Sequence, residues 1–302
     1  MSQKILILGS SNTDMVVKVE HLPAPGETIL GGEFTMGAGG KGANQAVAAR
    51  RLGGDVTFIC KVGKDLFGEN AVKQYQKEGI DTSNILYSDK PSGVALIYVD
   101  HKAENCIAVA SGANSDITVD EVRSLEGVIK SSSLLLLQLE TPVDVVLEAA
   151  KIAYSAGVKV VLNPAPACEL PKELYKYLSL IIPNQGESAL LSGEDVYDEA
   201  SAIEAAKALV DKGVESVVIT MGSKGSMIYD NLFGTFVPAR KVEAVDTTAA
   251  GDTFCAGVCV ALAQGKPLAE AVAFGTAASS LTVQKMGAQD SIPTIDEVMQ
   301  IL

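Results

Sequence analysis

The sequence predicts an α/β protein in which helices flank a doubly wound, mostly parallel β-sheet, with a small β-sheet beside it. Short apolar, β-branched runs alternate with amphipathic segments along most of the 302 residues. Several amphipathic segments end in glycine, the usual helix stop, and two regions alternate with no helical pattern between them. Because 47% of the residues are hydrophobic, the chain can bury a large core, and we expect a single domain over residues 1–302.

Each apolar run is short enough to be one buried strand of a parallel sheet. The predicted strands are residues 4–9, 55–60, 133–140, 158–164, 178–184 and 215–222. The stretches between them, such as 44–54, 142–157 and 199–213, are predicted as amphipathic helices. This alternation places ligands at the carboxyl ends of the strands.

Residues 12–35 and 92–110 do not follow this strand–helix alternation. They are predicted as hairpins of antiparallel strands with one exposed face. Their turn residues include "PAPGE" and "DHKAEN". His21 and His101 lie in the turns of these two regions, and we interpret both as surface positions. We expect these two regions to form a lid. The alternative is an ordinary extension of the main sheet at its edge.

Composition narrows the possible partners. The net charge of −13 and the sequence pI of about 4.7 leave no basic surface for nucleic acid, so phosphate would be handled by local geometry and a metal ion. No run approaches the roughly 18 apolar residues that span a bilayer, and we expect a soluble, cytoplasmic protein. The five cysteines form no CxxC pair and are interpreted as small core residues in a reducing compartment.

Polar residues lie at the ends of four of the six predicted strands. Because parallel strands present their carboxyl ends at one edge, these residues predict a shared active site. They are Asn12 and Asp14, then Glu140, then Asn184 and Glu187, and finally Thr220, Gly222 and Gly225.

The segment "GAGGKGAN" (37–44) matches the G-x-G-x-x-G pattern of dinucleotide-binding proteins. It lacks a buried strand before it and an acidic residue at the end of the next strand, so an NAD-dependent oxidoreductase is excluded. It is no Walker A loop either, since Gly42 follows Lys41. We interpret it as a loop that lets a small hydroxylated ligand approach closely, with Lys41 and Asn44 as donors.

Asp252 lies where a helix is expected to begin, near Ala249. A helix N-terminus attracts anions, so a carboxylate there is either a cap or a base that takes a proton from an alcohol beside a phosphoryl group. The segment alone leaves both interpretations open, and the polar residues at the other strand ends favour catalysis. We expect the helix dipole to keep Asp252 ionised.

Two segments, "GGKGANQAVAA" and "DTTAAGDTF", resemble the two signatures of the ribokinase-like (PfkB) family of carbohydrate kinases. The similarity continues through "SSNTDMV", "LPAPGET", "LLLQLETP", "LNPAPA", "PNQGE", "TMGSKG" and "KMGAQDSIP", in order along the chain. The resemblance implies an α/β core, a β lid that closes over a sugar and helps form a homodimer, and transfer of the ATP γ-phosphate to the 5-hydroxyl of D-ribose.

The resemblance also implies roles for individual residues. The sugar would be held by Asn12, Asp14, Gly39, Gly40, Lys41, Gly42, Asn44, Glu140 and Asp252. The base would be Asp252, and the anion hole would comprise Ala249, Ala250 and Gly251. Mg²⁺ and the phosphates would involve Asn184 and Glu187, and the nucleotide would contact Thr220, Met221, Gly222, Ser223, Lys224, Gly225, Gly251 and Thr276. An activating K⁺ would lie at Asp246, Thr248, Thr282, Lys285, Gly287 and Ser291, several of them acting through backbone carbonyls.

Two other functions remain open from the sequence. A kinase of the same family could act on deoxyribose, fructose or adenosine, although a nucleoside pocket should show an aromatic or apolar platform. Deoxyribose differs from ribose by one hydroxyl, which we assign to Asp14. A non-catalytic sugar-binding protein would have lost the base or the anion-hole glycine, and both Asp252 and Gly251 are present.

Overall fold

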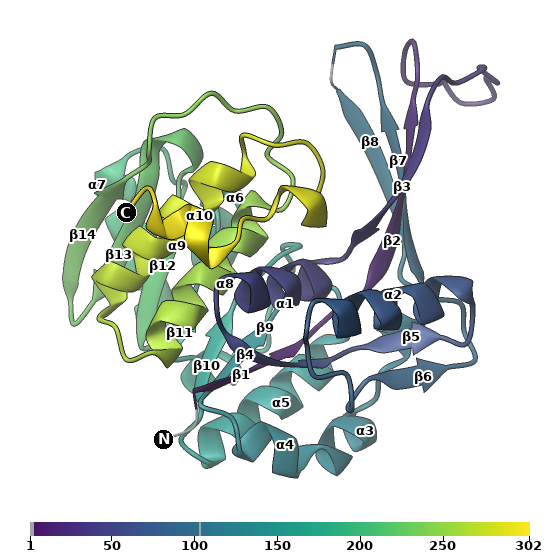
Figure 1. Ribbon diagram of the computed structural model, residues 1–302. Coiled ribbons are helices and arrows are strands. Elements are labelled where there is room, and N and C mark those ends of the chain that lie inside the picture. The colour runs from purple at the N-terminus through teal and green to yellow at the C-terminus, as the bar shows by residue number, and fades with distance from the viewer. Residues whose placement is uncertain (1–2, 103) are drawn as a thin grey trace.

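A computed structural model describes residues 3–102 and 104–302. The main sheet has eight strands in the order β14-β13-β12-β11-β10-β9-β1-β4 (Figure 1). The six strands from β12 to β4 in this order run parallel to one another. At the other edge, β13 pairs antiparallel with β12, and β14 pairs antiparallel with β13. Every predicted strand is present but shorter than its apolar run, most clearly at 133–140 and 178–184, where four and two residues pair as strand. The strands are β1 (Lys4–Leu8), β4 (Asp55–Ile59), β9 (Leu134–Leu137), β10 (Lys159–Leu162), β11 (Leu180–Ile181), β12 (Ser216–Thr220), β13 (Gly225–Asp230) and β14 (Phe233–Pro238).

Helices cover both faces of this sheet (Figure 1). Side chains alternate along a strand, so Ile5 and Ile7 enter the core on one face while Leu6 and Leu8 enter the core on the other. Burial on both faces explains the continuous apolar runs. The first face is covered by α1 (Lys41–Arg51), α2 (Leu66–Lys77), α8 (Ala250–Ala263), α9 (Leu268–Thr282) and α10 (Ile295–Met299). The second is covered by α3 (Val119–Ser124), α4 (Glu126–Lys130), α5 (Val143–Ser155), α6 (Gln185–Ser192) and α7 (Glu199–Asp211).

Short turns complete the chain, and glycine ends helices as predicted. Gly157 and Gly213, just after α5 and α7, have φ values of 73° and 116°, which residues with a Cβ rarely adopt. The 3₁₀ helices are η1 (Gly112–Asp116), η2 (Tyr175–Tyr177), η3 (Gly222–Lys224) and η4 (Gln289–Ser291).

A separate four-stranded sheet, the small sheet, projects from the body (Figure 1). Its order is β3-β2-β7-β8, with β2 and β7 parallel in the centre and an antiparallel strand on each side. The interpretation as an edge extension of the main sheet is therefore wrong, and the first hairpin runs beyond residue 35 to the end of β3. The strands are β2 (Asn12–Lys18), β3 (Phe34–Gly39), β7 (Gly93–Val99) and β8 (Asn105–Ala110); β5 (Lys61–Gly63) and β6 (Leu86–Ser88) form a further pair.

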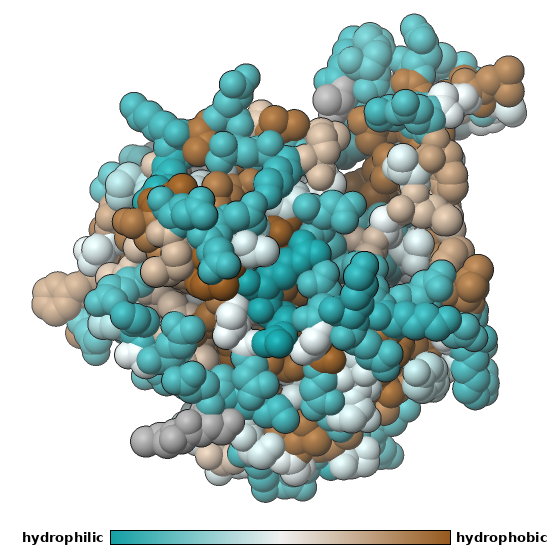
Figure 2. Space-filling view, viewed as in Figure 1, coloured by the Kyte–Doolittle hydropathy of each residue, from teal (hydrophilic) through white to brown (hydrophobic). Residues whose placement is uncertain are grey.

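One face of the small sheet is apolar and exposed. In the strand register, Met36 and Leu96 lie on either side of Met15, on the face opposite to that of its neighbour Asp14. Met36 is 60% exposed and Leu96 45% exposed. Figure 2 shows hydrophobic side chains along this projecting part of the molecule. Phe34 and Tyr98 extend the same apolar face.

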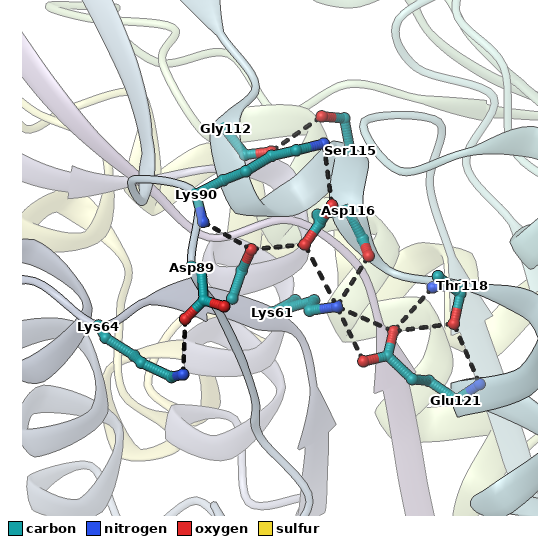
Figure 3. A network of polar contacts seen from close by, with 10 residues as sticks. Lys61, Lys64, Asp89, Lys90, Gly112, Ser115, Asp116, Thr118 and Glu121 are labelled. Atoms are coloured by element: carbon teal, nitrogen blue, oxygen red, sulfur yellow. Dashed lines mark hydrogen bonds and ion pairs between the residues drawn. The ribbon is translucent and has the colours of Figure 1, made fainter.

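An ionic cluster fastens the small sheet to the body (Figure 3). The ammonium of Lys61, a residue only 7% exposed, lies 2.8 Å from Glu121 Oε1 and 3.5 Å from Asp116 Oδ2. Lys90 reaches the other carboxylate oxygen of Asp116 at 2.8 Å. Lys90 precedes β7 and Asp116 follows β8, so these contacts hold both ends of the β7–β8 hairpin.

All five cysteines are free, and three of them, Cys60, Cys255 and Cys259, are buried as predicted. Cys106 is exposed, so its interpretation as a core residue is wrong; it lies on β8, an edge strand of the exposed small sheet. Over residues 3–102 and 104–302, no helix combines the length and apolar character that crossing a membrane requires.

Candidate active site

The carboxylate of Asp252 lies in the first turn of α8, whose start confirms the prediction from the sequence. The N-cap residue Ala249 has a φ of 60°, a strained value for a residue with a side chain, and no side chain caps the helix. Gly251 is exposed, with open space where a Cβ would lie, whereas Asp252 is only 7% exposed. The positive end of the helix dipole therefore opens to solvent beside a buried carboxylate.

Both carboxylate oxygens of Asp252 accept hydrogen bonds from α1. Asn44 Nδ2 donates to Oδ2 at 2.9 Å, and Gln45 Nε2 donates to Oδ1 at 3.0 Å. Burial raises the pKa of Asp252, while the charge of Lys41 and the two amides lower it. The prediction based on the helix dipole was thus incomplete, because burial opposes ionisation and the sequence did not reveal how deeply the carboxylate lies.

The glycine-rich segment is a strand end joined to a helix start and not a loop. Gly40 is the N-cap of α1, with a φ of 89°. The backbone N–H of Lys41 and the hydroxyl of Ser10 donate to the same oxygen of Glu140, at 3.0 and 2.5 Å. A Cβ on Gly42 would lie 2.5 Å from Ser10 N, so only glycine lets α1 approach the end of β1. Glu140 is therefore held at the N-terminus of α1, where the dipole favours an anion.

Asp14 comes to this site from the small sheet. A Cβ on Gly39 would lie 2.2 Å from both carboxylate oxygens of Asp14, which places this carboxylate against the backbone of β3. Burial, together with the charges of Glu140 and Asp252, raises the pKa of Asp14 to about 6. The two charge effects, which add to that of burial, show that three carboxylates from three separate segments lie close together.

Lys41 is the cation among these carboxylates. Burial lowers its pKa, but the charges of Asp252, Glu140 and Glu187 outweigh burial and raise it overall. A hydroxyl group donates one hydrogen bond and accepts others, so carboxylates beside an ammonium and an amide suit a ligand with several hydroxyls.

Asn12 is held at the start of β2, next to this cluster. It is 6% exposed, and its Oδ1 accepts a hydrogen bond from Asn114 Nδ2 at 2.7 Å. A Cβ on Gly93 would lie 2.2 Å from that oxygen. Asn114 also accepts from the backbone N–H of Ser11 at 2.9 Å, so it fixes the junction between β1 and β2.

Asn184 and Glu187 form a capping box at the start of α6. Asn184 Oδ1 accepts from the Glu187 N–H at 2.9 Å, and Glu187 Oε2 accepts from the Asn184 N–H at 2.8 Å. Burial raises the pKa of Glu187, and the charges of Lys41 and Asp252 also act on it. Glu187 therefore lies near the Asp252 cluster, and its carboxylate is the kind of oxygen ligand that Mg²⁺ or its water shell accepts. Thr220 pairs with Asn184 through an isolated bridge.

The stretch 221–225, predicted to border a nucleotide, turns from β12 into β13. Met221 is 3% exposed and belongs to the core, so its side chain cannot contact a nucleotide. Lys224 Nζ donates to the carbonyl of Tyr197 at 2.7 Å. Thr276 lies on α9, where its hydroxyl donates to the carbonyl of Val272 at 2.8 Å. The exposed residues of the turn are Gly222, Ser223 and Lys224, and Gly225 is buried.

Three of the residues predicted to hold a monovalent cation meet at Asp246. Its Oδ1 accepts from the N–H and the hydroxyl of Thr248 at 2.9 and 2.7 Å, and its Oδ2 accepts from the N–H of Gly287 at 2.9 Å. Carboxylate and carbonyl oxygens are the ligands that a hard cation prefers. In the described part of the chain, no group of three or more His, Cys, Asp or Glu side chains is placed to hold a metal ion.

The other predicted cation residues can contribute only through their backbone. Thr282 is buried and its hydroxyl donates to Thr253 at 3.1 Å. The side chain of Lys285 pairs with Glu297 at 2.8 Å. The hydroxyl of Ser291, which is fully buried, donates to the carbonyl of Ala288 at 2.8 Å.

Sequence reasoning missed a buried amide network beneath Asp252. Gln45 is 0% exposed, and its Oε1 accepts from Gln138 Nε2 while its Nε2 donates to Asn163 Oδ1 at 3.0 Å as well as to Asp252. Gln289 Nε2 donates to Asn44 Oδ1 at 3.3 Å. The available signal was a polar residue inside an apolar run, as in "LLLLQLE" and "VVLNP".

Known proteins are similar to this chain over its whole length. The profile of the pfkB family of carbohydrate kinases matches residues 2–295. The chain is 46% identical over 303 residues to a ribokinase of Haemophilus influenzae, covering 100% of this chain and 99% of that protein. It is 34% identical over 305 residues to a deoxyribokinase of Salmonella typhi, covering 99% of this chain and 98% of that protein. The structure of an Arabidopsis thaliana ribokinase complexed with ribose and ATP is similar with a TM-score of 0.92 at 30% identity, covering 100% of this chain and 99% of that one. The chain belongs to the pfkB family of carbohydrate kinases, the ribokinase-like family that its motifs resemble.

Proposed function

We propose that this protein transfers the γ-phosphoryl group of ATP to the 5-hydroxyl of D-ribose and releases D-ribose 5-phosphate and ADP. Support comes from full-length relatives that are named ribokinases, one of them described with ribose and ATP bound. The gathering of Asp14, Lys41, Asn44 and Glu140 suits a small sugar with several hydroxyls, each of which needs a donor and an acceptor.

The observation that carries the proposal is the position of Asp252 beside the open N-terminus of α8. Asp252 takes the proton of the 5-hydroxyl, the oxygen forms a bond to Pγ, and the bond from Pγ to the bridging oxygen of ADP breaks. The N–H groups at the start of α8 stabilise the negative charge of the transferring phosphoryl group. Ala249, Ala250 and Gly251 frame this anion hole.

The remaining roles follow from where each residue lies. Asn184 and Glu187 would hold Mg²⁺ through its water shell, and the bound ion would supply positive charge against the phosphates. The nucleotide lies along Thr220 to Gly225, with Thr276 on the adenine side. The use of ATP by this protein suits a cytoplasmic location. The sugar is held by Asn12, Asp14, Gly39, Gly40, Lys41, Gly42, Asn44 and Glu140. The loop before α8 would be held in shape by the positive charge of a K⁺ ion bound at Asp246, Thr248, Thr282, Lys285, Gly287 and Ser291.

The small sheet acts as a lid over the sugar and as a dimer interface. Asp14 lies on the face toward the site, whereas Phe34, Met36, Leu96 and Tyr98 form an exposed apolar face on the other side. Exposed apolar faces of this kind mark protein contacts, and the same face of a second copy would cover it as a homodimer.

The test is ADP release, measured by chromatography, from ATP–Mg²⁺ with ribose, deoxyribose, fructose or adenosine, with and without K⁺. We expect turnover with ribose that K⁺ increases, and a kcat about 10²- to 10⁴-fold lower in Asp252→Asn. Release of ADP without any acceptor, or an Asp252→Asn variant as fast as the natural protein, would contradict the mechanism.

A preference for deoxyribose is the second candidate, favoured by the 34% identity to a deoxyribokinase. The two sugars differ by one hydroxyl, assigned here to Asp14. Ribose selectivity that is lost in Asp14→Asn would support that assignment. Equal kcat/KM values for both sugars in the natural protein would mean that the enzyme accepts pentoses in general.

A further inference from the structure

Gln45 is a fully buried polar residue that the proposed reaction does not use. Its Nε2 donates to Asp252 Oδ1 and to Asn163 Oδ1, both at 3.0 Å, and its Oε1 accepts from Gln138 Nε2. The side chain has two N–H donors, and both are occupied. With 0% exposure, Gln45 has neither the access nor the free donors to contact a sugar.

The network also fixes which way each amide points. Asn163 Nδ2 donates to the carbonyl of Ile182 at 3.0 Å, which turns Asn163 Oδ1 toward Gln45. A flipped Gln45 would set its oxygen against two acceptors, Asn163 Oδ1 and Asp252 Oδ1, and its NH₂ against the NH₂ of Gln138. One orientation is therefore allowed, and it aims a hydrogen-bond donor at Asp252.

The two oxygens of Asp252 are thereby made unequal. Oδ1 is held by Gln45 from the closed interior, and Oδ2 is held by Asn44, a residue 6% exposed that borders the sugar cluster. A proton arriving from the sugar side meets Oδ2 first. Preorganisation of this kind contributes to catalysis because the carboxylate does not have to reorient during the reaction.

We propose that Gln45 is a positioning residue for phosphoryl transfer, which holds Asp252 Oδ1 so that Oδ2 receives the proton of the sugar hydroxyl. In this step the O–H bond of the hydroxyl breaks and an Oδ2–H bond forms. The electron pair left on the sugar oxygen forms the new bond to Pγ, and the bond from Pγ to the bridging oxygen breaks, so that ADP leaves with that electron pair. The inference rests on the proposed function, since it assigns to Asp252 the role of base.

Gln45 acts on Asp252 together with charged groups from other elements. Its hydrogen bond lowers the pKa of Asp252, against burial, which raises that pKa. Loss of the hydrogen bond therefore moves the acid limb of the pH–rate profile to higher pH. Other charged or titratable groups also interact electrostatically with Asp252. They are Lys41 on α1, Glu140 after β9, Asp14 on β2, Glu187 on α6 and Cys255 on α8.

The test compares Gln45→Met with Gln138→Met. Each replaces a buried amide by a thioether of similar length, but Gln138→Met leaves both bonds of Gln45 Nε2 in place. We expect Gln45→Met to lower kcat about 10- to 100-fold with little change in the KM for ribose. Gln138→Met should lower the midpoint of thermal unfolding to a similar degree and change kcat less than about threefold. Equal kcat values in the two variants would overturn the inference.

A double-mutant cycle separates positioning from general structural damage. If Gln45 acts through Asp252, Gln45→Met should have no further effect on the residual rate of Asp252→Asn. The same fold-loss in both backgrounds would overturn the inference while leaving the proposed function intact. A wild-type rate in Asp252→Asn alone would overturn the proposed function itself. Should Gln45→Met fail to fold, Gln45→Glu is the second variant, because it keeps the shape of the side chain and the bond from Gln138 but places a negative charge against Asp252. If the acid limb of its pH–rate profile does not shift, the positioning role is equally refuted.

Discussion

Replacing Gly39 by alanine tests whether Asp14 contributes to sugar binding. The added Cβ would lie 2.2 Å from both carboxylate oxygens of Asp14, well inside van der Waals contact, so the carboxylate must move by about an ångström or more. Gly37 lies on the same strand and directly opposite Asp14 in the register, yet a Cβ there meets nothing within 4 Å. Gly37→Ala is therefore a matched control that adds the same methyl group without displacing the carboxylate.

The expected loss follows from one charged hydrogen bond. A hydrogen bond to an ionised group contributes about 1.5–3 kcal/mol, which corresponds to about a 10- to 150-fold decrease in kcat/KM. Because Gly39 has a negative φ, alanine is compatible with the strand and stability should change by less than about 1 kcal/mol. The loss should appear mainly as a higher KM for ribose, since the hydroxyl assigned to Asp14 in the proposed function does not react.

The pH dependence offers a second readout of the same residue. The pKa of Asp14 is raised to about 6, so protonation below this pH removes the acceptor and the KM for ribose should rise as pH falls through about 6. Steady-state ADP release between pH 5 and 8, with ribose varied, measures this for the natural protein and both variants. Identical KM values for Gly39→Ala and Gly37→Ala would refute the assignment, and so would a KM in the natural protein that stays flat across this range.

Three further predictions concern stability and assembly. Hydrogen bonds, first that from Lys90, lower the pKa of Asp116 to about 2. The stability that ionised Asp116 provides is therefore complete above about pH 4 and is lost as pH falls toward about 2. The urea midpoint of Asp116→Asn should depend less on pH in that range than the midpoint of the natural protein, and parallel curves would contradict this. Phe58 is 0% exposed and packs edge-on against Tyr75 with ring centroids 5.3 Å apart, so Phe58→Ala should lower the free energy of unfolding by about 3–5 kcal/mol in denaturant titrations, a loss below 1 kcal/mol being inconsistent with such packing. Leu96→Arg on the apolar face of the small sheet should convert a dimer to a monomer in light scattering; an unchanged mass would place the interface elsewhere.

Much of the main fold was predictable because it depends on local patterns. A strand buried on both faces must be apolar along its length, and this made residues 4–9 and 215–222 recognisable in the sequence. Asn184 and Glu187 were recognised as a polar pair because they lie within one helical turn, whereas the capping box that they also form was not predicted. The small sheet was predicted as two hairpins, but its parallel pairing of β2 with β7 joins segments that are distant in the chain.

The sequence by itself determined the alternation of buried strands and helices along the chain, the helix that begins near Ala249, and the polar residues at the strand ends. Each of these is set by neighbours within a few positions. Only the tertiary structure decided the depth of Asp252, the pKa of Asp14 and the buried amides of Gln45, Gln138 and Asn163. Burial and charge depend on which distant segments come together, here β2, α1, β9, β10 and α8, and no local pattern encodes the distance between them.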